Sequence, residues 1–182
     1  MSTKQYLVLT AVGPDRPGLV NEISSLVLAA GANLEDSRMA ILGGEFALLV
    51  LVSGEQQAID QVEQRGGELG ARLGLRVITK VTTSPQDSRD YLAYEIWVEG
   101  LDRPGIVQRV TAVLAGRGAN VASLESRLVY APESGTPLFV LEASLQIPSQ
   151  AALGELQKEL SALCEVESWE YTLERPLAQP AR

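Results

Sequence analysis

The sequence lacks histidine and has a single cysteine, Cys164, among its 182 residues. Without histidine, neither a Ser-His-Asp nor a Cys-His nucleophilic arrangement is possible, and the commonest metal ligand and general base is missing. One cysteine excludes an internal disulfide and a cysteine-rich zinc site, and it fits a reducing compartment. We therefore expect no catalytic residues, no metal and no cofactor, and we interpret the protein as a non-enzyme.

Positive charge is also scarce, because 15 Lys and Arg stand against 23 Asp and Glu, for a formal net charge of −8. Nucleic-acid binders take most of their affinity from basic patches that neutralise phosphates. The densest basic group is Arg65, Arg72 and Arg76, and Glu63 and Glu68 interrupt it, which is typical of a solvated helix face. We expect no direct contact with nucleic acid.

Long apolar runs are missing too. The longest, Phe46 to Val52, is far shorter than the roughly 18 residues that a membrane span needs. The first residues lead directly into a predicted strand, so we recognise no signal peptide and expect a cytoplasmic protein without membrane contact. The remaining composition, 46% hydrophobic and 21% charged, is that of a globular protein with a real core.

Two short motifs occur twice in the same order. Asp15-Arg16-Pro17-Gly18 recurs as Asp102-Arg103-Pro104-Gly105, and Gly31-Ala32-Asn33 recurs as Gly118-Ala119-Asn120, both 87 positions later. Ser37-Arg38 also resembles Ser126-Arg127, now 89 positions later, which predicts two extra residues just after Asn120. Such a repeat at a fixed period indicates a duplication.

Each copy has the pattern of strand, helix, strand, strand, helix and strand. In the first copy we expect strands at 6–12, 34–42, 46–52 and 75–82, with helices beginning near Pro17 and spanning 55–73. In the second we expect strands at 92–98, 121–129, 138–147 and 166–173, with helices at 104–117 and 150–163. This order predicts an α+β fold: two ferredoxin-like βαββαβ units in tandem, each an antiparallel four-stranded sheet with both helices on one face.

The domain boundaries follow from composition. Residues 1–83 form the first predicted domain and 91–175 the second. Residues 84–90 are polar and rich in turn-forming residues, as expected of a linker. Residues 176–182 have the composition of a frayed tail.

The two copies differ in the sheet face that the helices leave open. Residues 138–147 alternate between apolar and mostly polar side chains, whereas 46–52 are apolar on both faces. We expect the open face of the first copy to be buried, against the second copy or a second chain, and we expect a homodimer. The alternative is a central strand that is simply apolar throughout.

The turn before the first helix of each copy is the best candidate site. Unpaired N–H groups and partial positive charge at a helix N-terminus suit a carboxylate. Gly18 and Gly105 allow a ligand close to the backbone, and Asp15 and Asp102 can accept hydrogen bonds from an ammonium group. An α-amino acid would find complements to both its ends here. In the alternative interpretation, Asp is only an N-cap, Pro occupies the first helical turn and Gly merely packs.

Other polar residues near these motifs have two interpretations each. Arg16 and Arg103 either clamp a carboxylate or lie in solvent on the first helical turn. Asn33 and Asn120 either shape the turn that ends the helix or reach the same corner as the Asp-Arg-Pro-Gly motif. Arg38 and Arg127 are interpreted as edge-strand charges that oppose aggregation.

The Asp-Arg-Pro-Gly turn, the apolar helix after it and the Gly-Ala-Asn that precedes the next strand resemble the ACT domain, a regulatory module that binds amino acids. Residues 36–50 resemble the first domain of the glycine cleavage system transcriptional repressor family. In ACT domains the ligand lies at the turn between the first strand and the first helix, usually where two domains meet. The resemblance therefore implies these ligand-binding residues: Asp15, Arg16, Pro17, Gly18, Leu19, Val20, Asp102, Arg103, Pro104, Gly105, Ile106 and Val107.

The same resemblance implies an amino-acid-sensing regulator with glycine as the first candidate effector. Such a protein would control transcription through a DNA-binding partner protein, without binding DNA itself. The alternative is a regulatory subunit that binds and controls an enzyme of amino-acid metabolism. No nucleotide-binding or hydrolase motif in the sequence favours an enzyme.

Overall fold

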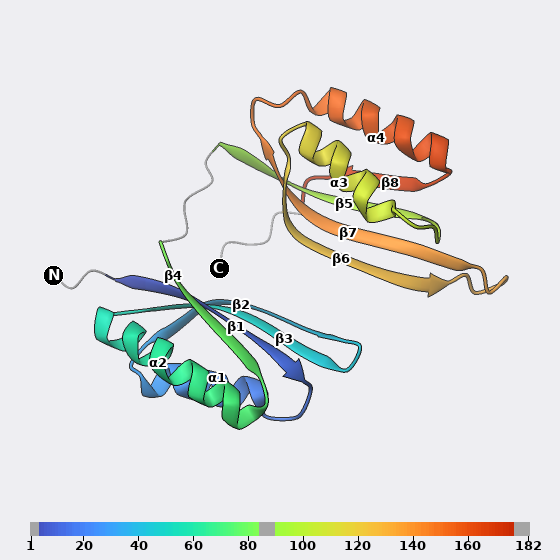
Figure 1. The fold of residues 1–182 in the computed structure, drawn as a ribbon. Helices are drawn as coiled ribbons and strands as arrows, with labels where there is room; N and C mark the ends of the chain where they lie inside the picture. The colour runs from blue at the N-terminus through green and yellow to red at the C-terminus, as the bar shows by residue number, and fades with distance from the viewer. Residues whose placement is uncertain (1–3, 84–89, 177–182) are drawn as a thin grey trace. The chain divides into compact units, whose positions relative to one another are not determined.

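The computed structural model describes residues 4–83 and 90–176, and the chain divides into two compact units, Met1–Gln86 and Asp87–Arg182 (Figure 1). Most of the predicted linker, 84–90, and most of the predicted tail, 176–182, lie outside the described residues. Each unit is described by itself below.

Both units contain four strands and two helices in the predicted order. The elements of the first unit are β1 (Gln5–Pro14), α1 (Leu19–Ala29), β2 (Asn33–Leu42), β3 (Glu45–Gly54), α2 (Gln56–Leu73) and β4 (Arg76–Thr82). The elements of the second unit are β5 (Tyr91–Leu101), α3 (Ile106–Gly116), β6 (Asn120–Tyr130), β7 (Pro137–Pro148), α4 (Leu153–Glu167) and β8 (Glu170–Glu174).

Each unit folds as an antiparallel sheet with its two helices on one face (Figure 1). The strand orders are β2-β3-β1-β4 and β6-β7-β5-β8, so the first and third strands of each unit are central. The predicted fold, tandem βαββαβ units, is confirmed. We call the side of each sheet that carries no helix its helix-free face.

Side-chain alternation divides each sheet between its two faces. In the first unit Leu7, Leu9 and Ala11 of β1 are buried in one core with Leu19, Ile23 and Val27 of α1. The second unit buries the corresponding positions of β5 and α3 in the same way. Each fully buried Leu or Ile contributes about 1.5–3 kcal/mol of transfer free energy. This burial fixes which side chains remain on the helix-free face.

The last helix and strand are placed differently from the prediction. Helix α4 spans Leu153–Glu167 instead of 150–163, and β8 begins at Glu170 instead of 166. Val166 has a side chain typical of strands, but it is helical and 80% exposed. The helix ends only at Ser168, whose φ of 57° is left-handed and whose N–H bonds the carbonyl of Glu165. The C-cap at Ser168 therefore outweighs the strand propensity of Val166.

Cys164 is buried in the core of the second unit, and this burial raises the pKa of its thiol.

The register corrects the predicted match between the two Ser-Arg pairs. Both units have an irregularity at the same place, between Leu34 and Asp36 and between Val121 and Ser123. The extra residues of the second unit lie instead in its hairpin, where Tyr130 pairs with Pro137, while Leu42 pairs with Glu45. Strands β1 and β5, and likewise β2 and β6, therefore keep the spacing of 87, whereas the spacing from β3 to β7 is 93 because of the longer hairpin. Arg38 accordingly corresponds to Glu125, not to Arg127.

Candidate functional site: the turns before α1 and α3

The two Asp-Arg-Pro-Gly turns end in the same unusual backbone conformation. Gly18 and Gly105 have φ values of 96° and 97°, in the left-handed region that only glycine adopts easily, and each is the N-cap of its helix. The helices start at Leu19 and Ile106, two residues after Pro17 and Pro104. The predicted start at proline was wrong, because the glycine conformation separates proline from the helix.

The aspartates of the two motifs do not cap the helices, which corrects the structural alternative given above. No side chain of the described residues caps either N-terminus, and the aspartates lie three residues before the N-cap glycines. The Asp15 backbone N–H instead donates to the Gly44 carbonyl at 3.1 Å, which attaches the turn to the β2–β3 hairpin. The Asp15 carboxylate is exposed and does not cap α1, so it is available to a ligand.

The first N–H groups of α1 are also available. The first helical bond runs from the Glu22 N–H to the Gly18 carbonyl at 3.0 Å, which leaves the N–H groups before Glu22 without a helical acceptor. Nothing lies within 4 Å of the position where a Cβ on Gly18 would stand. The helix end is thus open to a small anion.

These features border one open hollow of about 580 Å³ in the first unit. Its lining combines the turn, the first part of α1 and the hairpin strands: Asp15, Arg16, Gly18, Leu19, Val20, Asn21, Ser24, Met39 and Phe46. Phe46 is buried and Met39 is 54% exposed, so part of the wall is apolar. The arrangement can hold a carboxylate at the helix end and an ammonium group at Asp15. Pro17 lies within the same turn, exposed and outside the lining.

The second turn shares the backbone but differs in its surroundings. The Asp102 N–H donates to the Pro137 carbonyl at 3.3 Å, and Asp102, Arg103, Pro104 and Gly105 are exposed. Ile106 is buried and Val107 half-buried against the core. The Arg109 Nε would lie 3.7 Å from a Cβ on Gly105, and Arg109 also pairs with Glu167. This arginine, which sequence reasoning did not single out, places a cation beside the second turn.

Asn33 and Asn120 lie at the opposite end of their sheets from the turns. Asn33 pairs with Ser53, whereas Pro14, next to the turn, pairs with Glu45. Ser53 lies eight positions along β3 from Glu45, which is about 26 Å. Asn120 likewise pairs with Gln146, and its Nδ2 donates to the Gln146 Oε1 at 2.9 Å. The structure therefore does not bring either asparagine to the corner, because a helix carries the chain to the far end before β2 or β6 begins.

A polar cluster at that far end was missed by sequence reasoning. Glu35 accepts hydrogen bonds from Lys4 at 2.6 Å, from Ser53 at 2.5 Å and from Asn33 at 3.3 Å. These donors, that of Lys4 foremost, lower the pKa of Glu35 from 4.5 to about 2. Ser53 is fully buried, and the bond to Glu35 satisfies its hydroxyl. The donors come from β2, from β3 and from the residue that precedes β1, so nothing local in the sequence indicates the cluster.

The residues described at both turns offer no metal site. In residues 4–83 and 90–176, no group of three or more His, Cys, Asp or Glu side chains is placed to hold a metal ion. No helix in the same ranges is long and apolar enough to cross a membrane.

Comparison with known proteins agrees with this fold. Residues 5–80 match the family model described as "ACT domain". The glycine cleavage system transcriptional repressor of Escherichia coli K12 is 35% identical over 166 residues, covering 90% of this chain and 86% of the repressor. The chain belongs to the family of this repressor. The match spans both units, so the family relationship is not limited to one of them.

Two solved structures resemble this member of the repressor family over nearly the whole chain. A protein of unknown function from Galdieria sulphuraria has a TM-score of 0.84 and 35% identity, covering 96% of this chain and all of that chain. A protein described as a candidate glycine cleavage system transcriptional repressor has a TM-score of 0.73 and 36% identity, covering 95% of this chain and 98% of that chain. The named members of the family are regulatory proteins, and the tandem arrangement of two ACT-type units is a feature they share with this chain.

Proposed function

We propose that this protein senses a small amino acid, glycine first, at the turn before α1, and regulates transcription through a DNA-binding partner protein. It carries out no reaction of its own. The observation that carries the proposal is the open hollow of about 580 Å³ at Asp15 and Gly18. There the free N–H groups at the start of α1, which can donate to a ligand carboxylate, lie together with the exposed carboxylate of Asp15. The names of the curated relatives support a role in regulating glycine cleavage.

Glycine is a chemically reasonable effector for this corner. Its carboxylate would accept hydrogen bonds from the free N–H groups at the start of α1, and its ammonium group would donate to Asp15. The left-handed Gly18 lets a ligand approach the backbone without meeting a side chain. The second turn provides the same backbone, so the same chemistry at Asp102 is the second site of the proposal.

The test is a thermal-unfolding titration of the full chain with glycine, serine and alanine. We expect a saturable rise in Tm with glycine, since a ligand at a hundredfold excess over its Kd stabilises the folded state by about 2.7 kcal/mol. Asp15→Asn should reduce the rise, and Asp15→Asn combined with Asp102→Asn should abolish it. Both variants should leave the Tm without glycine unchanged, because neither aspartate caps a helix.

Two further variants complete the test. Asp102→Asn reports whether the second turn binds, and Glu68→Gln, an exposed acidic residue on α2, is the control for loss of one negative charge. A glycine-dependent rise that survives in the variant with both aspartates replaced would contradict the proposed sites, and no rise with any amino acid would contradict the proposed sensing.

A further inference from the structure

The helix-free faces of the two sheets have opposite chemistry at matching positions. In the first unit this face is apolar at its centre, with Val12, Leu49 and Ile78 respectively 43%, 46% and 52% exposed. Large exposed apolar patches on a soluble protein mark an interaction surface. The patch extends over neighbouring strands, because Leu49 pairs with Thr10, and Thr10 pairs with Ile78.

In the second unit the corresponding positions are occupied by acidic residues. The equivalence follows from the register: Thr10 and Trp97, 87 positions apart, pair with Leu49 and Glu142. Where the first unit has three apolar residues and three cations, the second unit has a glutamate at each corresponding position. The pairs are Val8 and Glu95, Val12 and Glu99, Leu49 and Glu142, Arg38 and Glu125, Arg76 and Glu170, and Lys80 and Glu174.

The six glutamates of the second unit stand directly opposite one another in three pairs. Glu95 lies opposite Glu174, Glu99 opposite Glu170, and Glu125 opposite Glu142. Like charges in directly opposite positions destabilise a sheet. Within the described residues one ion pair reaches them, from Arg127 to Glu142 at 2.6 Å. The isolated unit therefore carries repulsion that an added cationic surface would relieve.

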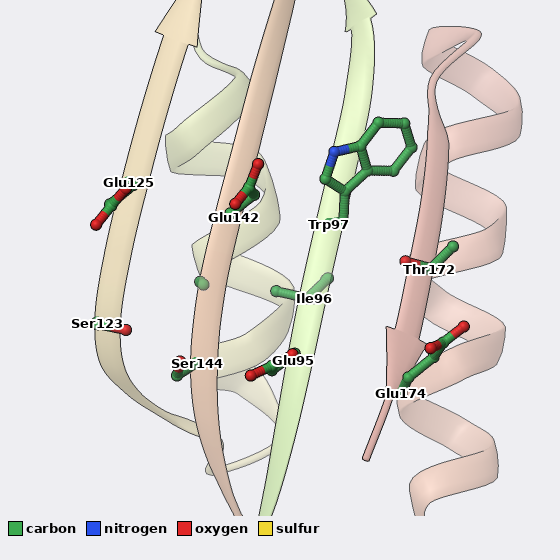
Figure 2. A pocket seen from close by; sticks show the side chains of 10 residues that line it. Glu95, Ile96, Trp97, Ser123, Glu125, Glu142, Ser144, Thr172 and Glu174 are labelled. Atoms are coloured by element: carbon green, nitrogen blue, oxygen red, sulfur yellow. The ribbon is translucent and has the colours of Figure 1, made fainter. Parts of the chain in front are cut away.

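The acidic face is also hollowed. Glu95, Glu125, Glu142, Glu174 and Trp97 border a depression of about 350 Å³, and Figure 2 shows their side chains along four neighbouring strands with the helices behind the sheet. The half-buried Trp97 gives this polar face an apolar element at its centre. The depression can receive side chains that project from another surface.

The first unit provides the complementary surface. Arg76 and Lys80 are exposed on its helix-free face and have no ion-pair partner in the part of the chain that the structure describes. Arg38 is 70% exposed and pairs with Asp36 at 2.5 Å. These three cations surround exposed apolar residues, which gain most by leaving water. Complementary potentials of this kind select a partner and fix its orientation.

We propose that the helix-free face of the first unit packs against the helix-free face of the second unit of another copy of this chain, in a two-fold dimer with two such contacts. One sheet face of four strands measures roughly 450 Å² at the usual strand spacing and rise, so a single contact buries only about 900 Å². Stable specific interfaces bury about 1,200–2,000 Å² in total, and two contacts reach that size. A two-fold, antiparallel pair of copies provides both contacts.

The test uses charge reversal on each face of the full chain, with dimerisation measured by sedimentation over a concentration series. One variant is Arg76→Glu with Lys80→Glu, and the other is Glu170→Lys with Glu174→Lys. Each alone should raise the dimer Kd by at least about tenfold, because both of its contacts then oppose like charges. An equimolar mixture of the two should restore the dimer, since one contact pairs two reversed faces and the other pairs two unchanged ones.

The controls separate this proposal from folding and net-charge effects. Arg65→Glu with Lys158→Glu changes the net charge by the same amount as Arg76→Glu with Lys80→Glu, but at exposed helix positions. This control should leave the dimer Kd unchanged. Glu170→Lys with Glu174→Lys removes two like-charge pairs, so the Tm should not fall.

Three results would overturn the proposal. The wild-type protein could be a monomer throughout, as it would be if the faces were joined only within one chain. The dimer could survive Glu170→Lys with Glu174→Lys, which would assign it to another surface. Lastly, the mixture of the two variants could fail to restore it.

Discussion

Glu35 shows how one residue can tie three strands together. The carboxylate lies at the irregularity of β2 and accepts hydrogen bonds from β3 and from the residue preceding β1. The second unit has Ala122 at the corresponding position, and an amide pair of Asn120 and Gln146 replaces the ionic cluster. The two units therefore close the same end of the sheet by different chemistry, and only the first depends on the charge of a carboxylate.

We predict a pH-dependent effect of Glu35→Gln on the unfolding of the first unit. The pKa of Glu35 is lowered to about 2, so its contribution is fully present above its ordinary value of 4.5 and is lost as the pH falls toward 2. The variant should be less stable than the wild type at pH 7, and the difference in the free energy of unfolding should vanish as the pH approaches 2. Urea unfolding at several pH values measures this, with Glu63→Gln as the control, and a difference independent of pH would contradict it.

The helix α2 illustrates how packing decides the role of a glycine. Gly67 and Gly70 both lie inside the helix, three residues apart. A Cβ on Gly67 would meet nothing within 4 Å, whereas one on Gly70 would lie 2.8 Å from the Leu75 carbonyl oxygen and from Val77. Gly70 is required by the close approach of β4, and Gly67 is not.

The same substitution at these two positions should have opposite effects. We predict that Gly67→Ala stabilises the first unit by about 0.5–1 kcal/mol through helix propensity. Gly70→Ala should destabilise it, because overpacking against the backbone typically costs about 1–3 kcal/mol and exceeds the propensity gain. Urea unfolding of the two variants provides a matched comparison, and equal effects would contradict the packing found here.

At the scale of the whole molecule, charge is distributed unevenly. The formal net charge is −8, yet the helix-free face of the first unit carries Arg38, Arg76 and Lys80. The acidic excess is concentrated on the corresponding face of the second unit. From this distribution in the described residues we expect a surface suited to protein contacts and poorly suited to phosphates.

We predict that the isolated protein does not shift DNA of any sequence in an electrophoretic assay at physiological salt. A DNA-binding regulator should instead be captured from cell extract by the immobilised chain, with a yield that changes when glycine is added. Mass spectrometry identifies what is captured, and an unrelated protein of the same net charge is the control. An enzyme of amino-acid metabolism as the partner, or direct binding to DNA, would contradict the proposed route to transcription.

Much of this protein was determined by its sequence alone. The repeated Asp-Arg-Pro-Gly and Gly-Ala-Asn motifs established the duplication, and hydrophobic periodicity established the order of helices and strands. Both are local signals, because a turn needs particular residues at particular positions and a half-buried element needs a period. The difference between the apolar 46–52 and the alternating 138–147 was visible for the same reason.

Only the tertiary structure decided which distant residues share a place. Asn33 follows the motif closely in sequence but lies at the far end of the sheet, and Arg38 corresponds to Glu125 although Arg127 looks more similar. The opposed glutamate pairs, the hollow at Asp15 and the donors to Glu35 depend on pairing between strands. Register is a non-local property, set by which residues are buried together and by the length of each hairpin, so no single segment of the sequence contains it.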